Sequence, residues 1–338
     1  MTLEGHVIPP VTSEVLALPL RTGELVRQAL DLLTRQDSGL RRASLYVGLI
    51  FLGTIAPCVV ILWLTMFDPR DSGEASAWAA WLLPAMIVAG IGWLEAAVYA
   101  RGLATVVIGG RVEGRPLRMP ESLAIVRRRF WRLFGAGALV GLVGGAVGFA
   151  ASATILLALG PVEMLDMGVS LALSLLVTTP FVYVPAAILL GEGEVFEAIR
   201  RSWRLVRLRP GLAIVSGMFG VFSQFIVLFG MSSGADIAWR LIDGSGLSDG
   251  FPPLLTLPVS AALVFAFGTL LLLVEAVSAS AAVHAFEALT HFTGGLELGR
   301  AFPAPGGRIW QPWLNGGLVV LVILAWLTLA GALATYPW

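Results

Sequence analysis

Apolar residues lie in long blocks along this chain, rather than alternating with polar residues as they do in soluble amphipathic elements. A helix needs about 20 apolar residues to cross a bilayer core that is about 30 Å thick. Seven blocks approach or exceed that length, and they lie at residues 44–66, 77–100, 133–159, 167–190, 211–231, 254–283 and 313–336. The pattern predicts an all-α polytopic membrane protein with about seven transmembrane helices.

Shorter amphipathic segments precede three predicted pairs of spans, at residues 23–37, 120–133 and 193–208. Their apolar faces and arginines predict helices that lie flat in the headgroup region of the membrane. We therefore expect three repeated units, each an amphipathic interfacial helix plus a helical hairpin, at about residues 23–110, 120–190 and 193–290. An extra C-terminal span at 313–336 follows the repeats. A cytoplasmic N-terminal segment (1–43) would precede a single transmembrane domain (44–338).

The composition agrees with a membrane protein and excludes several other classes. Hydrophobic residues make up 57% of the chain, charged residues only 13%, and the mean hydropathy is +0.86. Ordinary globular chains carry about a quarter charged residues. A water-soluble enzyme, a nucleic-acid binder and a disordered chain are therefore excluded, and the single cysteine, Cys58, cannot form an intrachain disulfide.

The positions of the basic residues predict an orientation in the membrane. All 22 basic residues are arginines, and 20 of them fall in four segments, at residues 1–43, 101–132, 191–210 and 284–312. Arginine-rich loops stay on the cytoplasmic side of the membrane. We expect a multi-pass protein of the bacterial inner membrane, with its N-terminus in the cytoplasm and its C-terminus outside it.

Two of the amphipathic segments carry a similar run of arginine and tryptophan. The candidate residues for binding lipid or a partner are Arg127, Arg128, Arg129, Trp131, Arg132, Arg200, Arg201, Trp203 and Arg204. One interpretation is that these side chains recognise anionic headgroups or another membrane protein subunit. The alternative is that the arginines only anchor the topology, as the positive-inside rule requires.

The second run, Glu197-Ala198-Ile199-Arg200-Arg201-Ser202-Trp203-Arg204-Leu205, lies directly before a predicted span. Over residues 191–210 the chain resembles a bacterial integral-membrane family, the membrane domain of glycerophosphoryl diester phosphodiesterases and its uncharacterised stand-alone relatives. In the fused members of that family a separate soluble barrel performs catalysis. We expect no such barrel in this chain, so the resemblance implies a membrane domain without phosphodiesterase activity.

Two acidic residues, Glu95 and Glu275, fall within predicted spans and occupy equivalent places in the first and third repeats. An acid inside a membrane is costly, so it is by default a candidate for a proton or ion role. Each also lies toward the inner end of its span, where a carboxylate can reach water or pair with an arginine such as Arg101. Both interpretations stay open.

A weak candidate for a metal site lies at the end of the sixth predicted span. His284, Glu287 and His291 follow one another at i, i+3 and i+7, which places them on one face of a helix. Imidazole and carboxylate groups ligate zinc or iron, but a closed zinc site needs about four ligands. A hydrated helix end explains the same residues, so neither a metal nor another cofactor is expected.

Small residues in the third predicted span indicate a place where helices pack closely. Gly137, Gly141 and Gly145 follow at intervals of four, which lets two helix backbones approach each other in lipid. In the fourth predicted span, Pro180 and Pro185 predict a kink.

We expect a non-catalytic membrane protein that acts as a scaffold or accessory subunit in a membrane complex or in envelope and lipid homeostasis. No paired carboxylates, nucleophile–base set or established metal motif points to an enzyme. The alternative is a proton- or ion-coupled permease that uses Glu95 and Glu275, because internal repeats with polar groups inside the membrane are typical of transporters.

Overall fold

A computed structural model of the chain describes residues 21–34, 38–66, 79–159, 175–191, 193–244, 253–292 and 314–335, together with residues 169, 172–173 and 312. These residues form helices and short connections, and no strand occurs among them. In chain order the helices are α1 (Thr22–Thr34), α2 (Ser38–Thr54), α3 (Ala56–Met66), α4 (Ala79–Val112), α5 (Met119–Arg128), α6 (Phe130–Leu159), the 3₁₀ turn η2 (Thr179–Phe181), α8 (Val184–Leu189), α9 (Val195–Leu208), α10 (Pro210–Gly244), α11 (Pro253–Phe292) and α12 (Gly316–Ala334). The first 20 residues of the predicted N-terminal segment, and residues 313 and 336 at the ends of the last predicted span, lie outside the described residues.

Several described helices are long and apolar enough to cross a bilayer, as in a multi-pass membrane protein. Four qualify individually, within α4, α6, α11 and α12. Two further candidates are helix pairs that bend at a short break, by 43° between α2 and α3 and by 117° between α9 and α10. The described residues therefore supply four to six candidate spans, in place of the seven that the hydropathy pattern predicts.

The difference lies partly in the fourth predicted span, at residues 167–190. Its described part, Leu175–Leu189, is a short apolar segment of fewer than 18 residues. Pro180 and Pro185 are the second residues of η2 and α8. Because proline lacks an N–H and clashes with the preceding turn, it is tolerated at the start of a helix but interrupts a continuous one. The helix is interrupted at both prolines, as the predicted kink requires, and its described part contains no continuous helix of 18 residues.

α11 lies at the centre of the bundle and packs against α1, α2, α4 and α10. Its crossing with α2 is close where Gly48 faces Gly268, because a Cβ added to Gly268 would lie 2.9 Å from Gly48 Cα and 2.8 Å from Phe51 Cβ. Residues without side chains let helix backbones touch, and the resulting dispersion contacts hold helices together in lipid. The Gly48–Gly268 crossing is thus a helix-packing contact that the sequence analysis did not identify.

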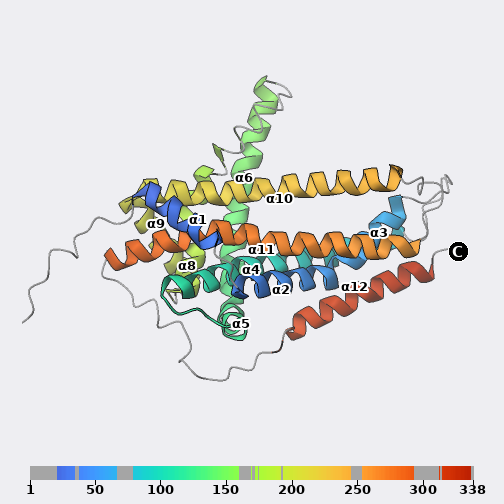
Figure 1. Ribbon diagram of the computed structural model, residues 1–338. Coiled ribbons are helices and arrows are strands. Elements are labelled where there is room, and N and C mark those ends of the chain that lie inside the picture. Colours follow the sequence, from blue (N-terminus) through green and yellow to red (C-terminus); the bar gives the residue numbers. More distant parts are fainter. Residues whose placement is uncertain are drawn as a thin grey trace, which may run out of the picture.

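All three predicted amphipathic segments are helical, as α1, α5 and α9. α9 turns sharply into α10 at Arg209, and Pro210 occupies the first position of α10, where a missing N–H costs no helical hydrogen bond. In Figure 1, α1, α8 and α9 gather at the end of the bundle where α10 begins and α11 ends. α9, at that end, carries Arg200, Arg201 and Arg204, which the sequence analysis assigns to the cytoplasm.

α6 differs in direction from the other long helices. In Figure 1 it runs across the direction of α10 and α11, and its far end extends beyond them. Only 11% of its most apolar stretch is buried, compared with 28% for α4, 33% for α12 and 39% for α11. Among the four individually qualifying helices, α6 is therefore the one that the rest of the described chain covers least.

Candidate functional site

A cavity of about 470 Å³ lies between α4, α6, α8, α10 and α11. Its wall is mostly apolar and includes Gly137 and Gly141 of α6. Two charged side chains reach it, Arg101 from α4 and Glu275 from α11. Pockets for small molecules are typically apolar, have volumes of about 300–1,000 Å³ and contain a few polar groups. The cavity has the size and composition of a ligand site.

Arg101 and Glu275 form a two-point ion pair on the cavity wall. Arg101 Nε donates to Glu275 Oε2 at 3.1 Å, and Arg101 Nη2 donates to Oε1 at 3.3 Å. This arrangement uses the planar fork of the guanidinium, which matches a carboxylate. The Arg101 side chain is 44% exposed and that of Glu275 is 16% exposed. Because both residues line the cavity, part of that exposed surface faces its interior.

The other intramembrane acid, Glu95, lies beside the N-terminus of α12. Its carboxylate faces the Asn315 side chain, and its Oε1 would be 4.0 Å from a Cβ on Gly317. Asn315 caps the helix, since its Oδ1 accepts a hydrogen bond from the Leu318 N–H at 2.7 Å. The free N–H groups and the dipole of a first helical turn stabilise a carboxylate. Glu95 therefore has a different environment from Glu275, although the sequence places the two at equivalent positions.

A chain of polar contacts extends from Asn315 toward α2 and α5. Asn315 Nδ2 donates to the Tyr99 hydroxyl at 2.9 Å. Arg127 donates to the Tyr46 hydroxyl at 3.3 Å and to the Pro312 carbonyl at 2.5 Å. The rings of Tyr46 and Tyr99 meet edge to face, with their centroids 5.8 Å apart. Arg127, which the sequence analysis assigns to lipid or partner binding, thus contacts the interior of the bundle.

Arg129 also points into the protein. It is 6% exposed, and its Nη1 donates to the Ile188 carbonyl at 2.9 Å and to the Leu189 carbonyl. These carbonyls belong to the last turn of α8, where a helix supplies no N–H donors for its own carbonyls. Arg201, which aligns with Arg129 in the sequence, donates to the Gly191 carbonyl at 3.5 Å. The two arginine motifs therefore converge on one helix end.

The other members of the two motifs lie on the surface. We call Arg128, Arg132, Arg200 and Arg204 the exposed arginines. Beside them, Trp131 is 77% exposed and Trp203 is 44% exposed, with the Arg207 guanidinium 5.4 Å from the centroid of the Trp203 ring. Arginine and tryptophan together at a helix start are typical of the headgroup region. The prediction of lipid or partner contact therefore rests on these surface side chains.

The glycine row of α6 has open space in front of it. A Cβ added to Gly137, Gly141 or Gly145 would meet no described group within 4 Å. On the adjoining row, a Cβ on Gly144 would be 3.7 Å from Val177 Cγ1. Within the described residues no other helix closes the predicted seam, and Gly137 and Gly141 face the cavity instead.

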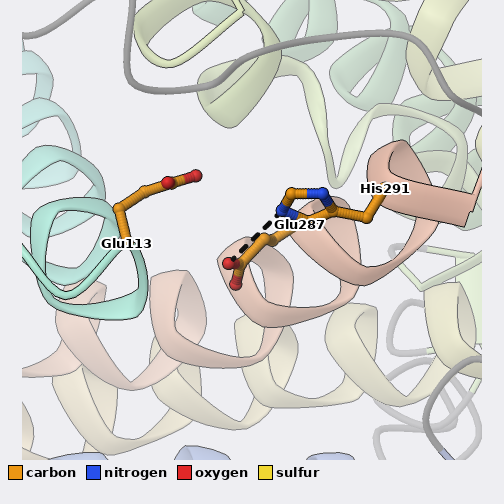
Figure 2. A group of neighbouring side chains, drawn as sticks. All are labelled: Glu113, Glu287 and His291. Atoms are coloured by element: carbon orange, nitrogen blue, oxygen red, sulfur yellow. Dashed lines mark ion pairs between the residues drawn. The ribbon is translucent and has the colours of Figure 1, made fainter. Parts of the chain in front are cut away.

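A group of potential metal ligands lies where the end of α4 meets α11, and Figure 2 shows its three side chains pointing toward one another. Carboxylate oxygens of Glu113 and Glu287 and an imidazole nitrogen of His291 lie within 4.8 Å of one another. The sequence analysis placed His284 in this group. The structure instead supplies Glu113, while His284 Nε2 is buried and has no hydrogen-bond partner among the described residues.

Comparison with family models, curated proteins and solved structures found no match for this chain. The resemblance of residues 191–210 to the membrane domain of glycerophosphoryl diester phosphodiesterases therefore stays a prediction. The cavity, the polar contacts and the exposed surfaces of the chain are the features that bear on its function.

The sequence analysis named Arg101 as a possible partner for the acids, and the Arg101–Glu275 pair confirms this for Glu275. It did not place Arg101 within the helix itself, and it missed that Glu113 lies beside α11. The predicted span ended at residue 100, whereas α4 continues to Val112. A signal was present for Arg101, because it follows a span directly and an acid occurs late in another span. Glu113 carries no such signal, since its neighbours Glu287 and His291 are far away along the chain.

Proposed function

We propose that the protein is a non-catalytic membrane scaffold or accessory subunit, and that α6 binds a helix of another membrane protein. The observation that carries this proposal is the position of α6. It leaves the bundle and is 11% buried over its most apolar stretch. Further along α6 than the cavity-lining Gly137 and Gly141, a Cβ on Gly145 or Gly148 would meet no described group within 4 Å. In lipid, rows of glycine are used where two helix backbones approach closely. α6 therefore offers a helix-binding face that the described bundle does not use.

The partners of the two intramembrane acids support the same proposal. Glu275 is held by Arg101, and Glu95 lies beside Asn315 at the start of α12. Both contacts join α4 to a neighbouring helix, and a partner offsets the cost of an acid inside the membrane, which supports a structural role for the two acids.

The proposed location is the bacterial inner membrane, with the N-terminus in the cytoplasm and three repeated units built on α1, α5 and α9. The arginine distribution supports this orientation, because 20 of 22 arginines fall in the segments assigned to the cytoplasm. The exposed arginines, together with Trp131 and Trp203, would contact anionic headgroups there.

The partner-binding role of α6 is tested by replacing glycines in its open row. Gly145→Leu and Gly148→Leu place branched side chains where a partner backbone would lie, and Gly90→Leu in α4 is the matched control, because it too faces open space. We expect a stoichiometric membrane protein to co-purify with the wild type and the control in mild detergent, and its yield to fall about tenfold or more in both α6 variants. A wild type without a stoichiometric partner, or α6 variants that retain it, would contradict the proposal.

The cavity favours a second candidate function, a permease for a small amphiphilic solute or for protons. Its 470 Å³ volume and the Arg101–Glu275 pair on its wall are the specific observations. If that function holds, Glu95→Gln combined with Glu275→Gln abolishes a pH-dependent flux into proteoliposomes without affecting expression. If the scaffold proposal holds, the wild type carries no such flux and the double variant still assembles with its partner.

A further inference from the structure

We propose that Glu113, Glu287 and His291 bind a divalent transition-metal ion that joins the end of α4 to α11. This proposal is independent of the partner proposed for α6. It rests on the spacing of the two helices, on the chemistry and positions of the three ligand atoms, and on the state of the Glu113 carboxylate.

The packing of α4 against α11 brings these ligands together, because Glu113 directly follows the end of α4 and its partners lie on α11. Arg101 pairs with Glu275, and Glu113 and Glu287 come together 12 residues further along each segment (113 − 101 and 287 − 275). Two helices whose contacts advance equally run parallel, and at 1.5 Å per residue the two contacts are about 18 Å apart. The paired helices therefore fix the separation of Glu113 and Glu287.

The three ligand atoms suit a transition metal. Two carboxylates and an imidazole are ligands that zinc, iron and manganese share, and the imidazole disfavours magnesium and calcium. His291 Nε2 lies 3.8 Å from Glu287 Oε1, and the whole group spans 4.8 Å. Zinc bonds of about 2.0–2.2 Å place neighbouring ligand atoms about 3.3–3.5 Å apart in a tetrahedral site. Each ligand atom therefore needs to move by less than about 1 Å.

The Glu113 carboxylate provides an independent reason to expect a cation. Its Oε1 is buried and has no hydrogen-bond partner among the described residues, and in Figure 2 the carboxylate points toward Glu287 and His291. A buried carboxylate oxygen without a partner is costly, and a second carboxylate close by adds repulsion. A divalent cation between the two carboxylates removes both costs at once.

The site can also be reached by an ion and can adjust to it. The His291 side chain is 64% exposed, so its ring can rotate toward the carboxylates without disturbing the core. Glu287 and His291 are one turn apart on α11, whereas Glu113 follows the end of α4. A bound ion would therefore hold two helices together, with a coordination position left for water, because three protein ligands do not complete a tetrahedron.

The test is a zinc titration of the full-length chain in mild detergent after treatment with a chelator, read by competition with a chromogenic chelator. We expect one Zn²⁺ per chain and a rise in the midpoint of thermal unfolding. Glu113→Gln, Glu287→Gln and His291→Gln should each weaken binding by about tenfold or more and remove that rise. The matched control is Glu194→Gln, since Glu194 is exposed and its side chain makes no capping hydrogen bond.

Thermal unfolding in the presence of chelator establishes whether each variant folds. His291→Gln is the decisive variant, because the His291 side chain is largely exposed and its replacement should not disturb folding. The proposal is overturned if the wild type binds no stoichiometric Zn²⁺, or if folded His291→Gln binds as tightly as the wild type. The proposal is also overturned if Glu194→Gln loses as much Zn²⁺ binding as the three ligand variants, because Zn²⁺ would then be bound adventitiously by surface carboxylates.

Discussion

Replacing Gly268 by alanine should force α2 and α11 apart at their crossing. The added Cβ would lie 2.8 Å from Phe51 Cβ and 2.9 Å from Gly48 Cα. Carbon atoms in ordinary contact are about 3.5–4.0 Å apart, so the overlap is roughly 0.6–1.2 Å. The atoms in the way belong to the α2 backbone or lie next to it, and they cannot move aside by a change of rotamer. The helices themselves must shift.

The size of the effect follows from two opposing contributions. Overpacking of a close contact costs about 1–3 kcal/mol. Alanine is also favoured over glycine within a helix by about 0.8–1.0 kcal/mol, which would stabilise the variant. Gly90→Ala receives the second contribution alone, because a Cβ on Gly90 meets no described group within 4 Å. The difference between the two variants therefore isolates the steric cost at the crossing.

The measurement is equilibrium unfolding in mixed micelles with increasing sodium dodecyl sulfate. Gly268→Ala should be less stable than Gly90→Ala by about 1–3 kcal/mol, which is roughly a 5- to 150-fold change in the unfolding equilibrium. A Gly268→Ala variant as stable as Gly90→Ala would refute the close approach of α2 and α11. If both variants lost the same free energy of unfolding, the effect would not come from the crossing of α2 and α11.

Three further outcomes are expected. Arg129→Gln should destabilise the protein by about 1–3 kcal/mol, because the α8 carbonyls lose their donor. Arg128→Gln at the surface should change stability by less than about 0.5 kcal/mol, and equal effects of the two variants in thermal unfolding would contradict this prediction. Changing all four exposed arginines to glutamine should weaken association with anionic vesicles by about 1 kcal/mol per arginine, and unchanged flotation with the vesicles would leave topology as the only role of these arginines. A reporter inserted near Arg115 should read as cytoplasmic and one fused after Trp338 as extracytoplasmic, whereas reporters on the same side would exclude the predicted topology.

The hydrophobic blocks by themselves determined that the chain is helical and that it belongs in a membrane. A bilayer core holds no water, so the backbone must satisfy its hydrogen bonds internally and a long apolar block has one stable solution, the helix. The amphipathic segments were equally readable, because arginine on one face and leucine, phenylalanine or tryptophan on the other favour an interfacial helix. Accordingly α1, α5 and α9 form near their predicted positions.

The number of spans could be read only approximately from hydropathy. A hydropathy profile measures how apolar a segment is, but it does not show where a proline interrupts the helix. Pro180 and Pro185 divide one predicted span into η2 and α8. Hydropathy also gives no direction, so nothing in the sequence indicated that α6 would cross the bundle.

Only the tertiary structure decided which similar residues face inward and which face outward. Gly48 and Gly268 meet at a helix crossing, whereas the more regular row at Gly137 and Gly141 does not, because lipid favours no apolar face over another and shape alone selects the contact. Arg129 is buried against α8 while its neighbour Arg128 is exposed, since successive residues point about 100° apart around a helix or its end.

The polar groups of the candidate sites depended on the tertiary structure for the same reason. The Arg101–Glu275 pair, and the group of Glu113, Glu287 and His291, each join residues 174 or more positions apart in the sequence. The sequence supplied the acids, the imidazoles and Arg101 as one possible partner, but the parallel packing of α4 against α11 determined which of these groups meet. A charge inside a membrane is costly enough to require a partner, and only the fold determines which one is within reach.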